Sequence, residues 1–169
     1  PFQTQDSWTT SVTRLIEAGP CHVSIYPLSV EDGTPLASMV DSGRLILPDE
    51  DEQADEMELA RRLLTGAGFA PYEVASYALP GHACKHNISY WTGVEYLGLG
   101  RSAASMVSPE TLLAASTLFS DFESSDDTTR VRILQTDDTA SAFEVEQLGV
   151  REAMGEDLML ACRMTRGIS

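Results

Sequence analysis

The chain has 169 residues, 43% of them hydrophobic, and its 26 acidic residues against 11 lysines and arginines give a formal charge of −15. The hydrophobic fraction is typical of a globular protein and too high for a disordered chain. Such an acidic body repels phosphate backbones and anionic lipids, which argues against nucleic-acid or membrane-surface partners. No apolar run reaches the roughly 18 residues of a membrane span.

The cysteines and the start of the chain bear on the compartment. Cys21, Cys84 and Cys162 are too few and too widely spaced for a disulfide framework, which favours reduced thiols. No basic leader or apolar signal segment opens the sequence at Pro1, so secretion has no support. We therefore expect a cytoplasmic location, and we expect the chain to be a piece of a longer protein.

Two amphipathic helices are predicted in the first half of the chain. Residues 6–18 carry apolar side chains at helical spacing, with Asp6 as the expected N-cap. Residues 49–67 begin with Asp49 and Glu52, which have the spacing of a capping box.

Two buried strands are predicted at residues 22–30 and 69–78, one after each helix. Pro27 suggests that regular pairing of the first strand ends midway. The order helix, strand, helix, strand favours parallel neighbours covered by helices, hence an α/β layer or barrel. Two strands cannot close a sheet, so further strands would have to precede Pro1 or come from another chain.

The second half is less regular. Residues 79–106 lack periodicity and are rich in Gly, His, Tyr and Trp. A short strand is predicted over residues 129–136 and a helix over residues 144–163. The polar acidic run at residues 120–127 is the best candidate for a domain boundary.

The densest group of reactive side chains is His82, Cys84 and His86. In an extended segment these alternate residues would face one side and could bind a metal or a haem iron. The alternative is a structural loop in which they bond to backbone, and the spacing is not that of a zinc finger. Glu73 is a carboxylate among apolar neighbours, either paired in the interior or facing the mouth of a site. No serine lies in a G-x-S-x-G elbow.

A series of motifs resembles one known family. They fall in the order and at the spacing seen in the radical S-adenosylmethionine family, in the group similar to oxygen-independent coproporphyrinogen III oxidase and its haem-chaperone members. The matching segments are residues 1–4, 22–29, 31–36, 47–50, 72–74, 80–87 with Tyr90-Trp91, 96–100 and 152–160. The most specific of them is His86-Asn-x-x-Tyr-Trp91.

The resemblance implies a fold and cofactors. The family's catalytic domain is an incomplete, TIM-like βα barrel that holds a 4Fe–4S cluster on a C-x-x-x-C-x-x-C loop, and the cluster reduces S-adenosylmethionine to a radical. Residues 1–107 would be the C-terminal part of that barrel, with the His/Cys-rich loop at 79–106. Residues 108–143 would connect it to the start of a mainly helical C-terminal domain at 144–169.

The resemblance also implies roles for individual residues. Ser29 and Gln3 would lie on the S-adenosylmethionine side of the barrel, because barrel sites lie at the C-terminal ends of the strands. His86 is the best candidate haem ligand, with Cys84 and His82 next. The partners would be a porphyrin or haem, and haem-accepting proteins in the chaperone branch.

The chain departs from the complete family pattern in two places. It has no C-x-x-x-C-x-x-C, so it contributes no cluster ligand, and we expect it to be inactive alone. Arg101, Ser102 and Ala104 also replace the Pro, Gly and His of the Pro-Gly-Ala-His-Ser segment found in many chaperone-type members. Three functions stay open: part of a radical oxidoreductase of porphyrin biosynthesis, with no catalytic residue assigned; a haem-binding chaperone; or a non-catalytic metal-binding scaffold domain.

Overall fold

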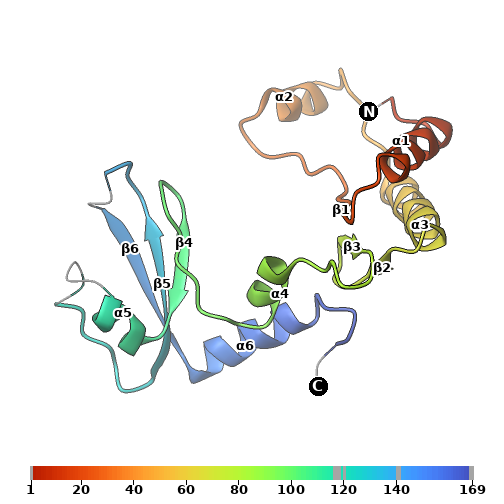
Figure 1. Cartoon of the computed structure of the whole chain (residues 1–169). Coiled ribbons are helices and arrows are strands. Elements are labelled where there is room, and N and C mark those ends of the chain that lie inside the picture. Colours follow the sequence, from red (N-terminus) through yellow and green to blue (C-terminus); the bar gives the residue numbers. More distant parts are fainter. Residues whose placement is uncertain (1, 116–118, 120, 140–141, 168–169) are drawn as a thin grey trace. The chain divides into compact units, whose positions relative to one another are not determined.

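The computed structural model describes residues 2–115, 119, 121–139 and 142–167. The chain divides into two compact units, a first unit of residues 1–84 and a second unit of residues 85–169 (Figure 1). Each unit is a small α/β arrangement with its own antiparallel sheet. None of the helices in the described part of the chain combines the length and apolarity needed to cross a bilayer.

Two long helices of the first unit confirm the sequence predictions, with one change of cap. Helix α1 spans Gln5–Glu17 and helix α3 spans Glu50–Gly66. The carboxylate of Asp49 caps α3, as predicted. The N-cap of α1 is Thr4 rather than Asp6, because Thr4 is extended and accepts a hydrogen bond from the backbone of Ser7. Asp6 lies in the first turn, where its charge still favours the helix dipole.

The strands of the first unit run differently from the prediction. Strands β1 (His22–Ser24), β2 (Ala70–Pro71) and β3 (Ser76–Ala78) form a sheet in the order β1-β3-β2. Both β1 and β2 are antiparallel to β3, so the parallel pairing expected for residues 22–30 and 69–78 is wrong. The physical reason is a turn at residues 72–75, which reverses the chain, so that β3 lies between β1 and β2 and runs antiparallel to both.

The segment between β1 and α3 contains a helix that the sequence did not suggest. Strand β1 ends at Ser24, and one further backbone bond joins Ile25 to Ala75 before Pro27. Helix α2 (Pro35–Asp41) then begins after Thr34, whose hydroxyl caps it. Threonine followed by proline is a helix-start signal that could have found it.

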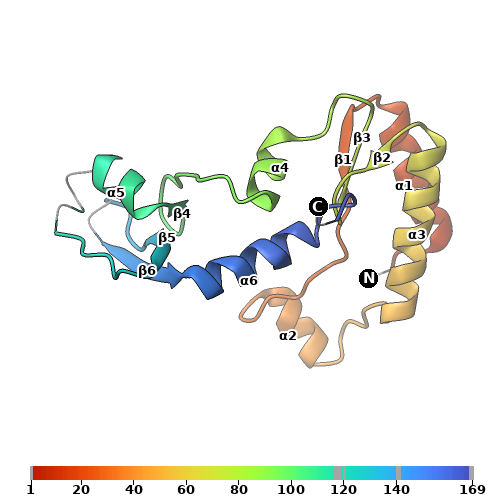
Figure 2. The same ribbon diagram turned by 90° about the horizontal axis from the view of Figure 1, so that it is seen from below.

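The apolar core of the first unit lies where α1 and α3 run side by side against the strands (Figure 2). Leu64 is fully buried, and Trp8, Ile16 and Met57 pack around the core from the two helices. The buried residues of this core are Val12, Val23, Ile25, Ala60, Leu64, Phe69 and Tyr77.

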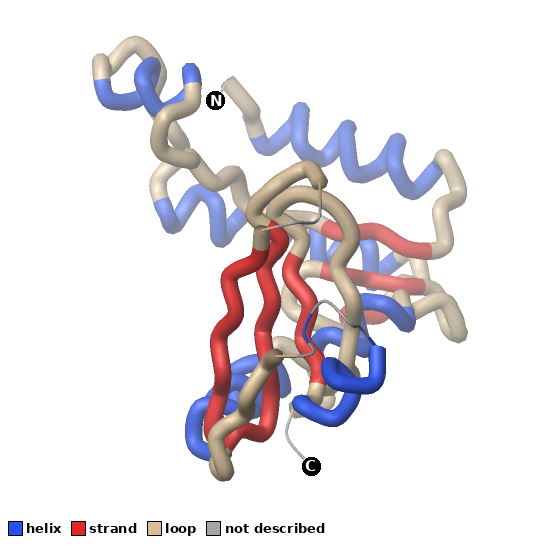
Figure 3. Tube along the Cα trace, turned by 90° about the vertical axis from the view of Figure 1, so that its left-hand side faces the viewer, coloured by secondary structure: helices blue, strands red, loops and turns tan. Residues whose placement is uncertain are grey.

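The second unit is built on a longer antiparallel sheet in the order β4-β5-β6 (Figure 3). Its elements in chain order are α4 (Lys85–Trp91), β4 (Ala104–Val107), α5 (Pro109–Ala115), β5 (Thr128–Gln135), β6 (Phe143–Gly149) and α6 (Val150–Ala161). Val107, Leu112, Val131 and Ile133 form its buried core, closed by three phenylalanines.

The prediction for the second half was right for one strand and partly wrong for the last helix. Strand β5 confirms the strand expected at residues 129–136. Of the helix expected at 144–163, residues 143–149 instead pair with β5 as strand β6. The alternation Phe-Glu-Val-Glu has a period of two, and pairing with a neighbouring strand outweighs the weak helical register.

The acidic run at residues 120–127 lies between α5 and β5, inside the second unit. The predicted division at residues 107 and 143 concerns the domains of a longer protein and stays a prediction. Ser120, the first residue of this run, lies outside the described residues.

Candidate functional site

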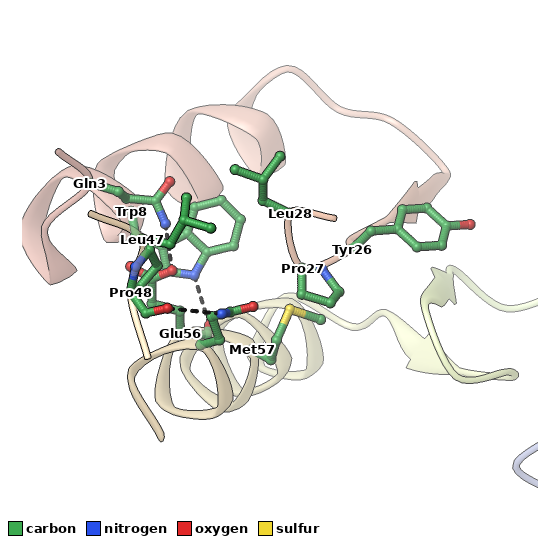
Figure 4. Close-up of a pocket in the computed structure, with 10 residues that line it drawn as sticks. Gln3, Trp8, Tyr26, Pro27, Leu28, Leu47, Pro48, Glu56 and Met57 are labelled. Atoms are coloured by element: carbon green, nitrogen blue, oxygen red, sulfur yellow. Dashed lines mark hydrogen bonds between the residues drawn. The ribbon is translucent and has the colours of Figure 1, made fainter. Parts of the chain in front are cut away.

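A pocket of about 170 Å³ opens in the first unit, and Figure 4 shows its lining. It lies between the start of α1, the segment after β1 and the first half of α3. Trp8, Leu28 and Met57 supply apolar walls, while Gln3 and Glu56 supply polar groups. The complete lining is Gln3, Trp8, Tyr26, Pro27, Leu28, Leu47, Pro48, Gln53, Glu56 and Met57.

Glu56 of α3 fixes two of these side chains. The side-chain amide of Gln3 donates to the carboxylate of Glu56 at 2.7 Å, and the indole Nε1 of Trp8 donates to its backbone carbonyl at 2.7 Å (Figure 4). Because the amide nitrogen of Gln3 is engaged, its carbonyl oxygen is the group left to accept a bond from a ligand. The pocket thus combines a flat apolar wall with an oriented acceptor, as small-molecule sites do.

Gln3 and Ser29 were expected on the S-adenosylmethionine side of the barrel, and of these two residues only Gln3 lines the pocket. Ser29 is exposed and follows Leu28 directly, at the edge of the lining rather than within it. Glu56 was not expected from the motif series, because it lies six residues beyond the nearest motif, at 47–50.

The candidate haem ligands do not lie in one extended segment. His82 is exposed and Cys84 is half-buried in a loop, where the backbone of His82 donates to Leu79. Helix α4 begins at Lys85, so the exposed His86 belongs to a helix and to the second unit. Within the described residues, no three His, Cys, Asp or Glu side chains gather into a set that could hold a metal ion.

Helix α4 instead places His86 at the end of a row of aromatic rings. His86 and Tyr90 lie one helical turn apart, and their rings meet edge to face with centroids 4.8 Å apart. The ring of Tyr90 in turn contacts Tyr96, with centroids 4.5 Å apart. The histidine and the tyrosine of the His86-Asn-x-x-Tyr-Trp91 motif are therefore in direct contact.

A second pocket, the aromatic cavity, lies behind this row in the second unit and has a volume of about 240 Å³. Strand β5 and helix α6 contribute charged groups to it, and α4 contributes rings. It is lined by Tyr90, Trp91, Gly93, Val94, Tyr96, Met106, Arg130, Arg132, Glu156, Met159 and Leu160. The arginines could have been noticed from the sequence, because residues two apart in a strand share a face.

Ion pairs join β5 to α6 at the wall of this cavity. Arg130 pairs with Asp157 at 2.7 Å, and Arg132 pairs with both Glu146 and Glu156. Burial lowers the pKa of Arg132, but its bonds to the two glutamates raise it, and the net shift is upward. The guanidinium is therefore held in its charged form.

Burial raises the pKa of Tyr96, and the neighbouring Tyr90 adds to the shift. The phenol of Tyr96 therefore stays neutral at physiological pH and keeps its hydroxyl proton.

Three side chains keep a buried polar atom without a partner in the described part of the chain: Nε1 of Trp91, Nε of Arg163 and Oε2 of Glu73. The guanidinium of Arg163 stacks over the Trp91 ring at 4.3 Å. Glu73 is only 2% exposed. Of the two positions considered for Glu73, the interior one is observed, and it lines neither of the two pockets.

The cysteines do not fit an iron–sulfur cluster. Cys21 and Cys84 lie in the first unit and Cys162 in the second, and all three are free thiols. A cluster needs several thiolates at close spacing. The residues of this chain therefore cannot hold one in the family's manner.

Comparison with known proteins gives clear relatives. The chain is 44% identical over 103 residues to the heme chaperone HemW of Mycobacterium tuberculosis and 39% identical over 107 residues to that of Synechocystis. It is also 35% identical over 103 residues to the mitochondrial radical S-adenosyl methionine domain-containing protein 1 of Danio rerio. No family model and no solved structure matches the chain.

The matches cover 61–63% of this chain and 23–26% of these relatives, so the chain spans about a quarter of their length. They agree with the motif series read from the sequence. Over the matched residues the chain is similar to the proteins named heme chaperone HemW and radical S-adenosyl methionine domain-containing protein 1.

Proposed function

We propose that this chain is the haem-binding part of a HemW-type haem chaperone, with His86 as the iron ligand. The observation that carries the proposal is the His86-Asn-x-x-Tyr-Trp91 motif in a chain that is 37–44% identical to proteins named heme chaperones. Imidazole is a common axial ligand of haem iron. Of the two branches that the sequence left open, the relatives' names favour the chaperone over the oxidase.

The position of His86 suits a ligand that is later handed on. Its side chain is exposed on α4, while the edge contact with Tyr90 restricts the ring. A ligand bound at an exposed imidazole remains accessible to an accepting protein. Cys84 and His82, in the loop just before α4, are the next candidates for the iron ligand after His86.

The first unit would belong to the barrel of the complete protein. S-adenosylmethionine would bind in the pocket and donate a hydrogen bond to the carbonyl oxygen of Gln3, whose amide is oriented by Glu56. Ser29 would lie at the rim of the pocket. Trp8 and Met57 would pack against the adenine ring. The cluster and the remaining strands would be supplied by segments outside this sequence, and oxidase activity and a cytoplasmic location stay predictions.

Titration of the chain with haemin tests the proposal. We expect a Soret band shift in the wild type that is lost or displaced in His86→Ala, because the imidazole ligand is removed. His22→Ala is the matched control, since His22 bonds to Tyr72 in the first unit. An unchanged spectrum and affinity in His86→Ala would remove His86 as the ligand.

The competing scaffold function has its own readout. Absence of any haemin-dependent spectral change in the wild type would contradict haem binding altogether. Metal analysis of the purified chain that returned stoichiometric zinc, lost in Cys84→Ala, would favour the metal-binding scaffold instead.

A further inference from the structure

We infer that the aromatic cavity of the second unit receives the carboxylate-bearing edge of a planar aromatic ligand, and that Arg130 is the residue that binds the carboxylate. The inference rests on the proposed function, since it takes haem, which carries two propionates, as that ligand. It assigns a carboxylate site to residues that no motif of the sequence includes.

The walls of the cavity match a flat, polarisable molecule. Tyr90, Trp91 and Tyr96 present rings, and Met106 and Met159 present thioethers. Aromatic rings and methionine sulfur both pack favourably against other rings. At about 240 Å³ the cavity is smaller than the ~300–1,000 Å³ of pockets that enclose a whole ligand. It therefore suits one edge of a macrocycle.

The cavity also lies next to the candidate iron ligand. His86 contacts Tyr90, and Tyr90 is part of the cavity wall. A ligand held by His86 on one side and by the cavity on the other would lie along the ring of Tyr90. The two proposed contacts belong to the same compact unit, so a single rigid ligand could reach both.

Arg130 keeps donors for such a ligand. Both of its contacts with Asp157 run through Nη2, which leaves Nε and Nη1 without a partner among the described residues. Its side chain is 21% exposed, so its charge is only partly screened by water. Nε and Nη1 lie on different edges of the guanidinium, so each can donate one charge-assisted hydrogen bond to a carboxylate.

Arg132 is less suited to the role. One of its Nη atoms donates to Glu146 and the other to Glu156, so two carboxylates already neutralise it. Arg132 thus acts as a structural tie between β5, β6 and α6. Because the chain as a whole carries a charge of −15, an anionic edge needs a local cation, and Arg130 supplies it.

Gly93 allows the backbone to pass close to the ion pair of Arg130 and Asp157. A Cβ at Gly93 would lie 3.1 Å from the carboxylate of Asp157 and 3.3 Å from Nη2 of Arg130. The backbone also has a positive φ of 69° there, which glycine adopts without strain. Glycine thus lets the backbone approach the Arg130–Asp157 pair without displacing it.

Two forms of the same ligand test the inference. The full chain is titrated with haemin and with haemin dimethyl ester, whose carboxylates are blocked. The wild type should bind haemin more tightly than the ester. Arg130→Gln should weaken haemin binding by about 10- to 100-fold, which is the contribution expected of a hydrogen bond to a charged group. The affinity for the ester should not change. Arg101→Gln, at an arginine whose side chain is 66% exposed, is the control and should change neither affinity.

A second variant keeps the test decisive if Arg130→Gln disturbs folding. Asp157→Asn removes the carboxylate that competes for Arg130 and should tighten haemin binding but not ester binding. Equal affinities for haemin and its ester in the wild type would overturn the inference, as would an unchanged haemin affinity in a folded Arg130→Gln. Failure of the wild type to bind either form would refute the proposed function itself.

Discussion

Different interactions stabilise the two units of the chain, each within itself. In the first unit, two capped helices pack an apolar core against strands of only two or three residues. In the second, strands of seven and eight residues form a ladder, and arginines of β5 tie α6 to it. Apolar packing dominates one unit, and backbone pairing with partly buried ion pairs dominates the other.

The comparison explains why the candidate sites differ. The pocket of the first unit is a gap between helix and loop, with one polar pair on an apolar wall. The aromatic cavity has charged groups in its wall because the ion pairs that hold α6 also line it. A change at the second site should therefore alter the stability of its unit more readily than a change at the first.

The chain offers a separate reporter for each unit, because its two tryptophans are Trp8 and Trp91. Trp91→Phe leaves a probe of the first unit and Trp8→Phe leaves a probe of the second. Urea unfolding followed by fluorescence in these two backgrounds measures each unit by itself.

The largest effect is expected from Leu64→Ala in α3. Leu64 is 0% exposed, so its truncation leaves a cavity in the core and should destabilise the first unit by about 2–5 kcal/mol. Ile46→Ala, at a residue 85% exposed, is the control and should cost less than about 0.5 kcal/mol. An equal loss of unfolding free energy in both tryptophan backgrounds would show that the two units unfold together, and it would contradict the view that each is stabilised separately.

The next largest change in the free energy of unfolding is expected from Gly98→Ala in the second unit. The backbone of Gly98 bonds to Ser105, and an added Cβ would overlap the carbonyl group of Ala104, so we expect a loss of about 1–3 kcal/mol. Gly155→Ala is the matched control. It lies inside α6 with open space around it and should stabilise the unit by about 0.5–1 kcal/mol. Opposite signs from the two glycines, seen in the Trp8→Phe background, are the expected outcome.

Arg132→Met tests the ion pairs. Removal of the guanidinium leaves Glu146 and Glu156 unpaired at a partly buried place, and the second unit should lose about 1–2 kcal/mol, between the values of exposed and buried pairs. In the first unit, Arg61→Met breaks an exposed pair with Glu58 and should have no measurable effect. If 1 M NaCl abolished the Arg132 effect completely, the pair would be a surface contact.

The smallest effect is a pH dependence of the second unit. Hydrogen bonds from Thr111 and Ser108 lower the pKa of Glu95 below its usual 4.5. A lowered pKa in the folded state stabilises the protein above pH 4.5, and this contribution is lost as the pH falls through the folded-state value. Glu95→Gln should flatten the fall of the unfolding midpoint between pH 5 and about pH 3, whereas Glu123→Gln should not.

The helices were largely predictable from the sequence. The ends of α3 follow from Asp49 and Glu52, because a cap joins residues three apart in the chain. The strands were less predictable, since Phe69–Ala78 reads as one apolar run but contains a turn at residues 72–75. Strand pairing joins residues as distant in the sequence as His22 and Ala78. The periodicity of a strand does not indicate which other strand it pairs with.

The sequence by itself determined the cap of α3, the two long helices and the motif series that identifies the relatives of this chain. Only the tertiary structure decided the direction of the strands, the edge contacts of Tyr90 with His86 and Tyr96, and the pairing of Arg130 with Asp157. The reason is physical: helix formation is governed by neighbours within one turn, whereas a sheet and a cavity are made by residues that meet only after the chain has folded.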